Sequence, residues 1–284
     1  QIKNDISNDD SQLNMLKKLE LSDADHKELI SYCKSKKIKF FSTAFDDEGV
    51  SYLSSLNFDM FKIPSGELTN YPYLRAIAKT GIPVILSTGM ANIDEIEKTI
   101  NILVSYGTKK SEITVLHCNT EYPTPMSDVN LKAMLTIKEE LGVSIGYSDH
   151  TLGIEVPIAA VALGAIVIEK HFTLDRNLKG PDHKASLEPN ELKEMVSAIR
   201  NIEKAISGNG IKEPSLSEKK NIHIARKSIH LSKDLSSGSV ITEPDIISLR
   251  PGDGICTMNW ENVIGKQVNK DLKKFTKLTL KDLS

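Results

Sequence analysis

Short apolar or β-branched runs alternate with stretches of helical periodicity along the first 207 residues. The strands expected from this pattern cover residues 39–43, 61–65, 84–88, 114–119, 144–148 and 166–171. Each run is too continuous for a surface hairpin, which indicates strands of a parallel sheet that are buried on both faces.

Helical patterns follow these strands. Asn92 and Glu95 form a capping pattern ahead of apolar residues at helical spacing, and residues 153–164 read as a buried helix. Another periodic stretch runs from Leu192 to Ile206. Six βα units fit a (β/α)8 barrel of about 250 residues from which the first two units are absent. A doubly wound open sheet is the competing fold.

After a stretch rich in Gly, Ser and Pro at 207–217, the alternation of strands and helices gives way to short strands and turns. A barrel domain is therefore expected over 1–207, a linker over 208–220 and a small β-rich domain over 221–284. The last region repeats itself: the segments that begin at Lys233 and Lys270 match in register at Lys-Asp-Leu, Thr and Asp. Between the copies, Arg250-Pro-Gly-Asp-Gly254 predicts a turn that exposes its arginine.

Composition narrows the class of protein. The chain has 36 basic and 38 acidic residues and no long apolar stretch, which argues against membrane and nucleic-acid partners. Cys33, Cys118 and Cys256 are odd in number and widely spaced, as suits a reducing cytoplasm. The start at Gln1, with a polar run over residues 1–11 and no strand, reads as a chain that begins partway through its domain.

Two histidines close neighbouring predicted strands. His150 and His171 are separated by one helix, so both imidazoles should lie at the same rim of the barrel, where such folds keep their chemistry. With Asp149 and Glu169 beside them, the pair fits an open divalent-metal site, although either histidine alone would more often be structural. Three others, His26, His223 and His230, are expected to be solvated.

Hydroxyl and glycine residues end two other strands, in Ser65-Gly66 and Ser87-Thr88-Gly89. Glycine lets a phosphate approach backbone N–H groups and hydroxyls add donors, so with Lys62 and Thr43 near by these strand ends predict an anion site. The alternative is a pair of ordinary turns.

Three further residues are site candidates by position. Asn119 ends a strand, and the Tyr122-Pro-Thr-Pro125 loop would hold an aromatic hydroxyl over the rim. Glu67 follows a strand end and is either a site acid or a carboxylate at a helix N-terminus.

Together the motifs resemble the sialic acid synthases, bacterial N-acetylneuraminate and N,N'-diacetyllegionaminate synthases included. The resemblance runs from about residue 10 to the C-terminus, and these motifs carry it: Lys62-Ile-Pro-Ser-Gly-Glu67, Ser87-Thr-Gly-Met90, His117-Cys-Asn-Thr-Glu-Tyr-Pro-Thr-Pro125, Gly146-Tyr-Ser-Asp-His150, Glu169-Lys-His-Phe-Thr173, Gly180-Pro-Asp182 and Arg250-Pro-Gly-Asp-Gly254. It implies a TIM-type barrel followed by a small antifreeze-like (SAF) domain.

The resemblance also implies a reaction. Phosphoenolpyruvate condenses with N-acetylmannosamine or a 2,4-diacetamido-2,4,6-trideoxymannose: its C3 attacks the sugar's aldehyde carbon, water adds at C2 and phosphate leaves. A divalent metal, Mn²⁺ before Mg²⁺ or Co²⁺, would be held by His150 and His171, with Glu67 as a third catalytic residue. The implied substrate contacts are Lys62, Ser65, Ser87, Ser148, Thr43 and Asn119, together with Tyr122 and Asp182. A flexible linker before a small domain, and a loop that displays one arginine, further predict a domain-swapped homodimer in which Arg250 reaches the partner's sugar site. The alternative is an ordinary surface arginine.

The sequence departs from that family in three places. The first two strands are missing, so activity is expected to require the absent N-terminal portion. Ala44 replaces a common proline, and Phe275 replaces a usual glycine, so that turn needs another conformation or carries strain. Alternative functions are a related phosphoenolpyruvate-condensing synthase for another sugar and a noncatalytic sugar-binding or assembly protein.

Overall fold

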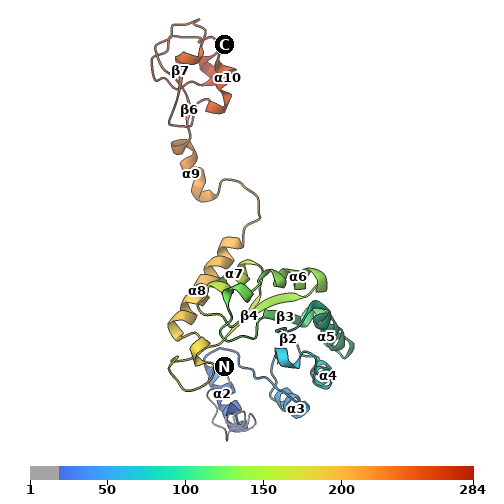
Figure 1. Cartoon of the computed structure of the whole chain (residues 1–284). Coiled ribbons are helices and arrows are strands. Elements are labelled where there is room, and N and C mark those ends of the chain that lie inside the picture. Colours follow the sequence, from blue (N-terminus) through green and yellow to red (C-terminus); the bar gives the residue numbers. More distant parts are fainter. Residues whose placement is uncertain (1–18) are drawn as a thin grey trace. The chain divides into compact units, whose positions relative to one another are not determined.

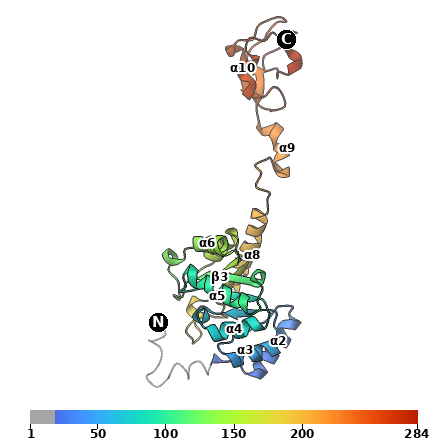
Figure 2. The same ribbon diagram turned by 90° about the vertical axis from the view of Figure 1, so that its right-hand side faces the viewer.

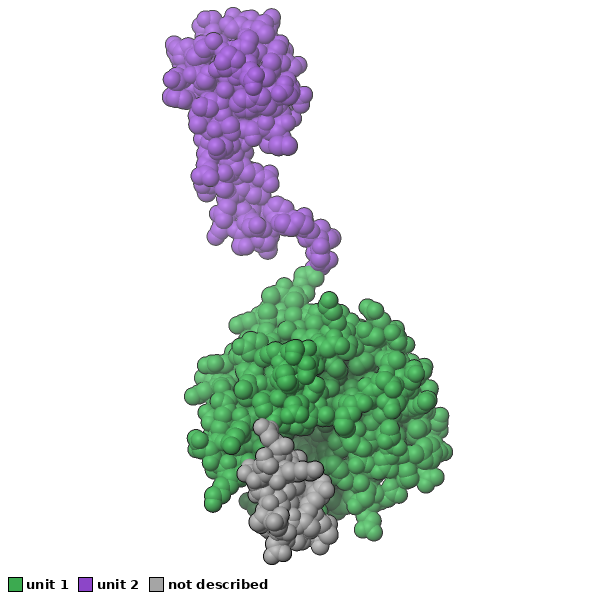
Figure 3. All heavy atoms as spheres, in the orientation of Figure 1, with its two compact units in different colours: residues 1–208 green, residues 209–284 purple. Residues whose placement is uncertain are grey.

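The computed structural model describes residues 19–284, so the polar run expected at 1–11 lies outside the described part. The chain divides into two compact units, residues 1–208 and 209–284, which are coloured separately in Figure 3. No helix among residues 19–284 is long and apolar enough to cross a membrane.

The first unit contains one parallel sheet whose strands are hydrogen-bonded in chain order (Figure 1). Its five strands are β1 (Phe61–Ile63), β2 (Val84–Ser87), β3 (Ile113–Cys118), β4 (Ser144–Asp149) and β5 (Val167–Lys170). The sheet is curled and open, as expected of part of a TIM-type barrel.

Helices lie outside the curled sheet; of those described in this unit, two precede β1, four connect successive strands and one follows β5 (Figures 1 and 2). They are α2 (Asp23–Ser35), α3 (Asp47–Ser55), α4 (Tyr71–Lys79), α5 (Ile93–Ser105), α6 (Lys132–Leu141), α7 (Glu155–Ala162) and α8 (Pro189–Ile206). The capping box of Asn92 and Glu95 at the start of α5 is present, as the sequence predicts.

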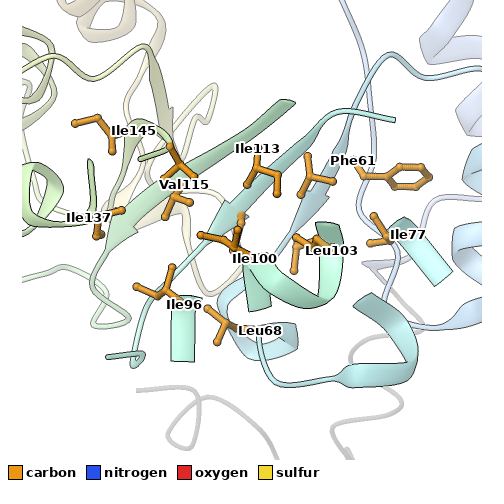
Figure 4. Packing of buried hydrophobic residues seen from close by; sticks show 14 of the residues in the cluster. Phe61, Leu68, Ile77, Ile96, Ile100, Leu103, Ile113, Val115, Ile137 and Ile145 are labelled. Atoms are coloured by element: carbon orange, nitrogen blue, oxygen red, sulfur yellow. The ribbon is translucent and has the colours of Figure 1, made fainter. Parts of the chain in front are cut away.

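The core lies between the sheet and the helices. Residues at alternating strand positions, such as Ile113 and Val115 of β3, pack against Ile96, Ile100 and Leu103 of α5 (Figure 4). Because side chains alternate along a strand, the residues between them face the concave side of the sheet. The helix-facing positions therefore form the core, and the other positions are left for chemistry.

The prediction of a strand over residues 39–43 is wrong. Within the described residues this segment is extended but has no ladder pairing. Its apolar character serves packing instead: Phe40 is partly buried against the core, and the carbonyl of buried Ala44 accepts the Tyr73 hydroxyl at 2.7 Å. The apolar residues of 39–43 indicate that the segment is partly buried, but burial alone does not distinguish a strand from a loop that packs on the core.

Two histidines expected to be solvated are buried. His26 stands edge-on to the rings of Phe40 and Tyr52, with centroids 6.2 and 5.5 Å away, and its Nδ1 lies 3.0 Å from the Ser22 carbonyl. His230 is buried in the second unit. Both imidazoles serve as packing groups that satisfy one backbone carbonyl.

The second unit is built from α9 (Leu216–Ala225), β6 (Ser228–Leu231), β7 (Ile246–Leu249) and α10 (Trp260–Val263), with β6 and β7 antiparallel. The sequence repeat is also a structural repeat. Lys233 pairs with Asp245 at 2.5 Å and Lys270 with Asp282 at 2.6 Å. Each aspartate also closes a capping box with the threonine three residues before it.

Gly238 and Phe275 occupy equivalent turns of the two copies, and both have left-handed backbones, with φ of 81° and 66°. Phe275 keeps this conformation although 58% of its surface is exposed, so little packing offsets the cost. The turn has therefore retained the glycine geometry without the glycine, and it is strained.

Replacing Phe275 with glycine is expected to stabilise the second unit by about 0.5–1 kcal/mol, because the left-handed penalty of about 1–2 kcal/mol exceeds the entropy cost of glycine. Hydrogen exchange at the amides of Ile229 and Leu278, which bond to Ile255 and Ile229, measures this free energy in the whole chain. Gly238→Ala is the matched control and should destabilise the same amides. Unchanged protection in Phe275→Gly would show that the turn carries no strain.

Candidate active site

A buried lysine and a glutamate meet on the concave face of the sheet. Lys62 of β1 is 8% exposed, and its Nζ lies 3.0 and 2.8 Å from the two carboxylate oxygens of Glu169 on β5. Ser148 of β4 donates to the same carboxylate at 2.7 Å. Three strands thus deliver a cation, a hydroxyl and an acid to one point.

The charge state of Glu169 follows from these partners. Burial alone would raise its pKa, but the charge of Lys62 and the hydrogen bonds from Lys62 and Ser148 outweigh burial and lower it. Glu169 is therefore an anion that holds Lys62 and Ser148 in place. From the sequence, Glu169 was expected only as a carboxylate close to a metal, not as the residue that holds Lys62 and Ser148. Its position two residues before His171, and hence on the same face of the strand, was the signal that could have placed it in the site.

Hydroxyl groups surround the ends of β1 and β2. Ser65 Oγ accepts the Gly89 backbone N–H at 2.9 Å and lies 3.3 Å from Cys118 Sγ. A side chain at Gly89 would collide with Ser65, Cys118 and Thr120, so glycine is required for this close approach. Ser87 is 3% exposed, and its hydroxyl has no hydrogen-bond partner among the described residues.

An unpartnered buried hydroxyl is costly, since it loses water and gains nothing in return. Ser87 is therefore free to bond with a ligand oxygen. With Lys62 on the neighbouring strand and Ser65 just after the end of that strand, the arrangement suits an anion with several oxygens.

The two histidines predicted at the rim lie side by side. The ring centroids of His150 and His171 are 5.3 Å apart. Tyr122 covers both, with its ring centroid 4.0 Å from that of His150 and 5.4 Å from that of His171. Burial raises the pKa of Tyr122 to about 12, so its hydroxyl remains a neutral donor at physiological pH.

The tautomer of His150 is fixed by the backbone. Its Nδ1 lies 2.5 Å from the Asn119 carbonyl oxygen, which only accepts, so Nδ1 carries the hydrogen and Nε2 keeps a lone pair. Burial lowers the pKa of His150, and the neighbouring His171 adds to the effect. A neutral imidazole with a free Nε2 is the form that binds metal ions.

These donors fit a divalent metal held in an open site. Within residues 19–284, no three His, Cys, Asp or Glu side chains converge as a closed metal cluster. Asp149 is occupied by Lys170 and Thr151, and Glu169 by Lys62 and Ser148, so neither carboxylate is free as the sequence analysis supposed. The imidazoles of His150 and His171 would hold the ion, leaving other positions for ligand oxygens.

Other candidates lie at the same rim. Asp182 Oδ2 is 3.7 Å from His171 Nδ1. The Asn119 side chain accepts the Glu121 backbone N–H at 2.7 Å, which shapes the loop that carries Tyr122. Near by in sequence, His183 Nδ1 lies 2.8 Å from the Thr173 hydroxyl.

Three candidates are not drawn into this cluster by any described contact. Thr43 is half-buried in the extended segment before α3. Glu67 accepts from Asn70 Nδ2 at 2.5 Å, and Asn70 is the N-cap of α4, as in the helix-terminal reading. Arg250 belongs to the second unit, where its Nε donates to the Ala225 carbonyl at 3.0 Å.

The fold and site define a class: a parallel barrel-type sheet with a cluster of hydroxyl groups and a lysine beside two adjacent histidines, in a chain that also has a small β-rich unit. Residues 1–212 match the NeuB family, and residues 226–284 match the SAF domain. The chain belongs to the NeuB family, the sialic acid synthases.

Individual relatives agree. The chain is 54% identical over 268 residues to N,N'-diacetyllegionaminic acid synthase of Campylobacter jejuni, covering 94% of this chain and 80% of the relative. It is 45% identical to the synthase of the same name from Legionella pneumophila, covering 97% and 78%. The crystal structure of N-acetylneuraminic acid synthetase from Leptospira borgpetersenii has a TM-score of 0.68 and 39% identity, over 74% of this chain and 72% of that one.

Proposed function

We propose that this chain acts as an N,N'-diacetyllegionaminic acid synthase, which joins phosphoenolpyruvate to a 2,4-diacetamido-2,4,6-trideoxymannose. One observation supports this reaction. Lys62 and Ser148 both contact Glu169 on the concave face of the sheet, and His150 and His171 lie side by side on the same face. The choice of sugar rests on the two legionaminic acid synthases, which are 54% and 45% identical to the chain.

Phosphoenolpyruvate is assigned to the hydroxyl and lysine cluster. The phosphate would take hydrogen bonds from Ser65 and Ser87, and from Ser148 once its hydroxyl turns away from Glu169, with Lys62 supplying the positive charge and Thr43 near by. Because Glu169 already holds Lys62, the lysine is oriented before the substrate arrives. Phosphate is the leaving group, so these donors also stabilise the charge that develops as it departs.

The sugar is assigned to the rim at His150 and His171. A bound divalent metal, which we propose to be Mn²⁺, would polarise the sugar's aldehyde. Tyr122 and Asp182 would orient the sugar, with Asn119 near by, so that its C1 faces C3 of phosphoenolpyruvate. A carbon–carbon bond then forms between these atoms, water adds at C2, and phosphate leaves. Glu67 is retained as a candidate acid whose hydrogen bond to Asn70 would have to open.

The decisive experiment offers both sugars with phosphoenolpyruvate and Mn²⁺. It uses the chain alone and the chain preceded by the two βα units expected from the resemblance. Release of phosphate with the diacetamido sugar, at a kcat/KM at least tenfold above that with N-acetylmannosamine, is the expected result for the extended protein. The reverse preference would make the product a different sialic acid, and sugar binding without phosphate release would favour a noncatalytic role.

We also propose that two chains form a homodimer in which Arg250 of one chain reaches the sugar site of the other. We place the protein in the cytoplasm, where its three free cysteines would stay reduced. The Arg250-Pro-Gly-Asp-Gly254 loop presents a fixed guanidinium fork, which suits recognition of an N-acetyl carbonyl. A second unit of this size buries a small core of its own.

Mixing extended proteins that carry Arg250→Ala and His150→Ala is expected to restore up to a quarter of the parental activity, because one site of each mixed dimer has both residues intact. Phosphate release measures the activity, and native mass spectrometry measures the share of mixed dimers. Mixed dimers without activity would return Arg250 to its own chain or to solvent.

A further inference from the structure

A buried ion pair joins the carboxyl ends of β4 and β5. Asp149 and Lys170 stand opposite each other in the last pair of the β4–β5 ladder, and Lys170 Nζ lies 2.5 Å from Asp149 Oδ2. The two side chains are 0% and 3% exposed. This pair is not part of the site described above.

Thr151 completes the network around the pair. Its backbone N–H and its hydroxyl donate to Asp149 Oδ1 at 2.9 and 2.8 Å, and its carbonyl accepts from Lys170 Nζ at 2.7 Å. Both carboxylate oxygens and two of the three ammonium hydrogens therefore have partners, which offsets the cost of removing the pair from water.

The pair lies directly behind the two imidazoles. Asp149 precedes His150 and Lys170 precedes His171, so by strand alternation the charged residues face the helices while the histidines face the concave side. The carbonyls of both histidines are also held, by the amides of Thr124 at 3.0 Å and Leu187 at 2.9 Å. The backbone of each histidine is thus constrained on both sides.

Stability gives little reason for such a pair, because apolar residues of similar volume are often as stabilising as a buried ion pair. The position of the pair offers a better explanation for its presence. An ion pair between the last two paired residues of β4 and β5 fixes the register and the separation of the two strand ends. We infer that Asp149, Lys170 and Thr151 are positioning residues that set the spacing of His150 and His171 for a single ion. This inference rests on the proposed function, in which these histidines share a metal.

The test replaces the pair by a neutral pair of similar shape, Asp149→Asn with Lys170→Met. Asparagine can still accept from Thr151, so the fold should survive. In calorimetry the Kd for Mn²⁺ should rise about 10- to 100-fold, as for other groups that orient metal ligands. The Kd for phosphoenolpyruvate should change less than threefold, whereas a merely structural defect would weaken both ligands. Lys233→Met, which breaks a Lys–Asp pair of the second unit whose lysine is 60% exposed, is the control for losing an ion pair away from the histidines and should leave both values unchanged.

Two further variants separate the possible failures. If His150→Ala binds Mn²⁺ like the parent, the proposed metal site is wrong; if it abolishes binding while the Asn–Met protein keeps parental affinity, only the positioning role is overturned. Should the Asn–Met protein fail to fold, Thr151→Val removes a single hydroxyl from the network. A rise of threefold or more in its Mn²⁺ Kd would support the inference, and an unchanged Kd would overturn it.

Discussion

A chain carrying both His150→Ala and His171→Ala is expected to show no Mn²⁺ binding in calorimetry, at concentrations at which the parent chain saturates. The two imidazoles lie with ring centroids 5.3 Å apart, and residues 19–284 contain no group of three His, Cys, Asp or Glu side chains that could hold a metal ion in their place. Loss of both leaves the ion without protein ligands of the kind it prefers.

The same double variant is expected to stay folded, because His150 and His171 face the concave side and lie outside the hydrophobic core between sheet and helices. Circular dichroism and the melting temperature check this. His223→Ala removes an exposed histidine of the second unit and serves as the control. Parental Mn²⁺ affinity in the folded double variant would move the metal site elsewhere in the protein.

Lys62→Ala is expected to weaken phosphoenolpyruvate binding about 10- to 100-fold and sugar binding less than threefold. A hydrogen bond to a charged group contributes about 1.5–3 kcal/mol, and 1.4 kcal/mol is a factor of ten in affinity. Titration calorimetry with each substrate in turn, in the presence of Mn²⁺, measures the two losses separately.

Removing Lys62 also leaves Glu169 as a buried unpaired carboxylate, which would repel phosphate and disturb the strands by itself. A second protein, Lys62→Ala with Glu169→Gln, removes that charge and isolates the missing cation. Lys79→Ala, in the last turn of α4, is the control for a lost surface charge. Equal losses for both substrates in both Lys62 variants would mean that Lys62 supports the rim and does not bind phosphate.

Sequence pattern was sufficient where one physical signal dominated. The five strands of the sheet, the capping box at Asn92 and the side-by-side placement of His150 and His171 follow from period and chain order alone. The segment 39–43 shows the limit of this method, because apolar residues there pack on the core without forming a ladder.

The partners of charged groups were harder to foresee. Asp149 and Glu169 both stand beside a histidine in the sequence, and both looked equally suited to a metal. Alternation along the strands sends Asp149 toward the helices and Glu169 toward the concave face, and only the structure shows that Lys170 and Lys62 claim them. Burial of His26 and His230 depended on contacts distant in sequence, which no local pattern encodes.

The contact between Lys62 and Glu169 also has a mechanical meaning. β1 and β5 are the first and last strands of the sheet, with three strands between them, yet their side chains touch. The ion pair therefore connects the two edges of the curled sheet and limits how far these edges can move apart. Lys62 and Glu169 thus connect the first and last strands of the sheet as well as setting the charge of the site, so a substitution at either residue acts on the shape of the sheet too.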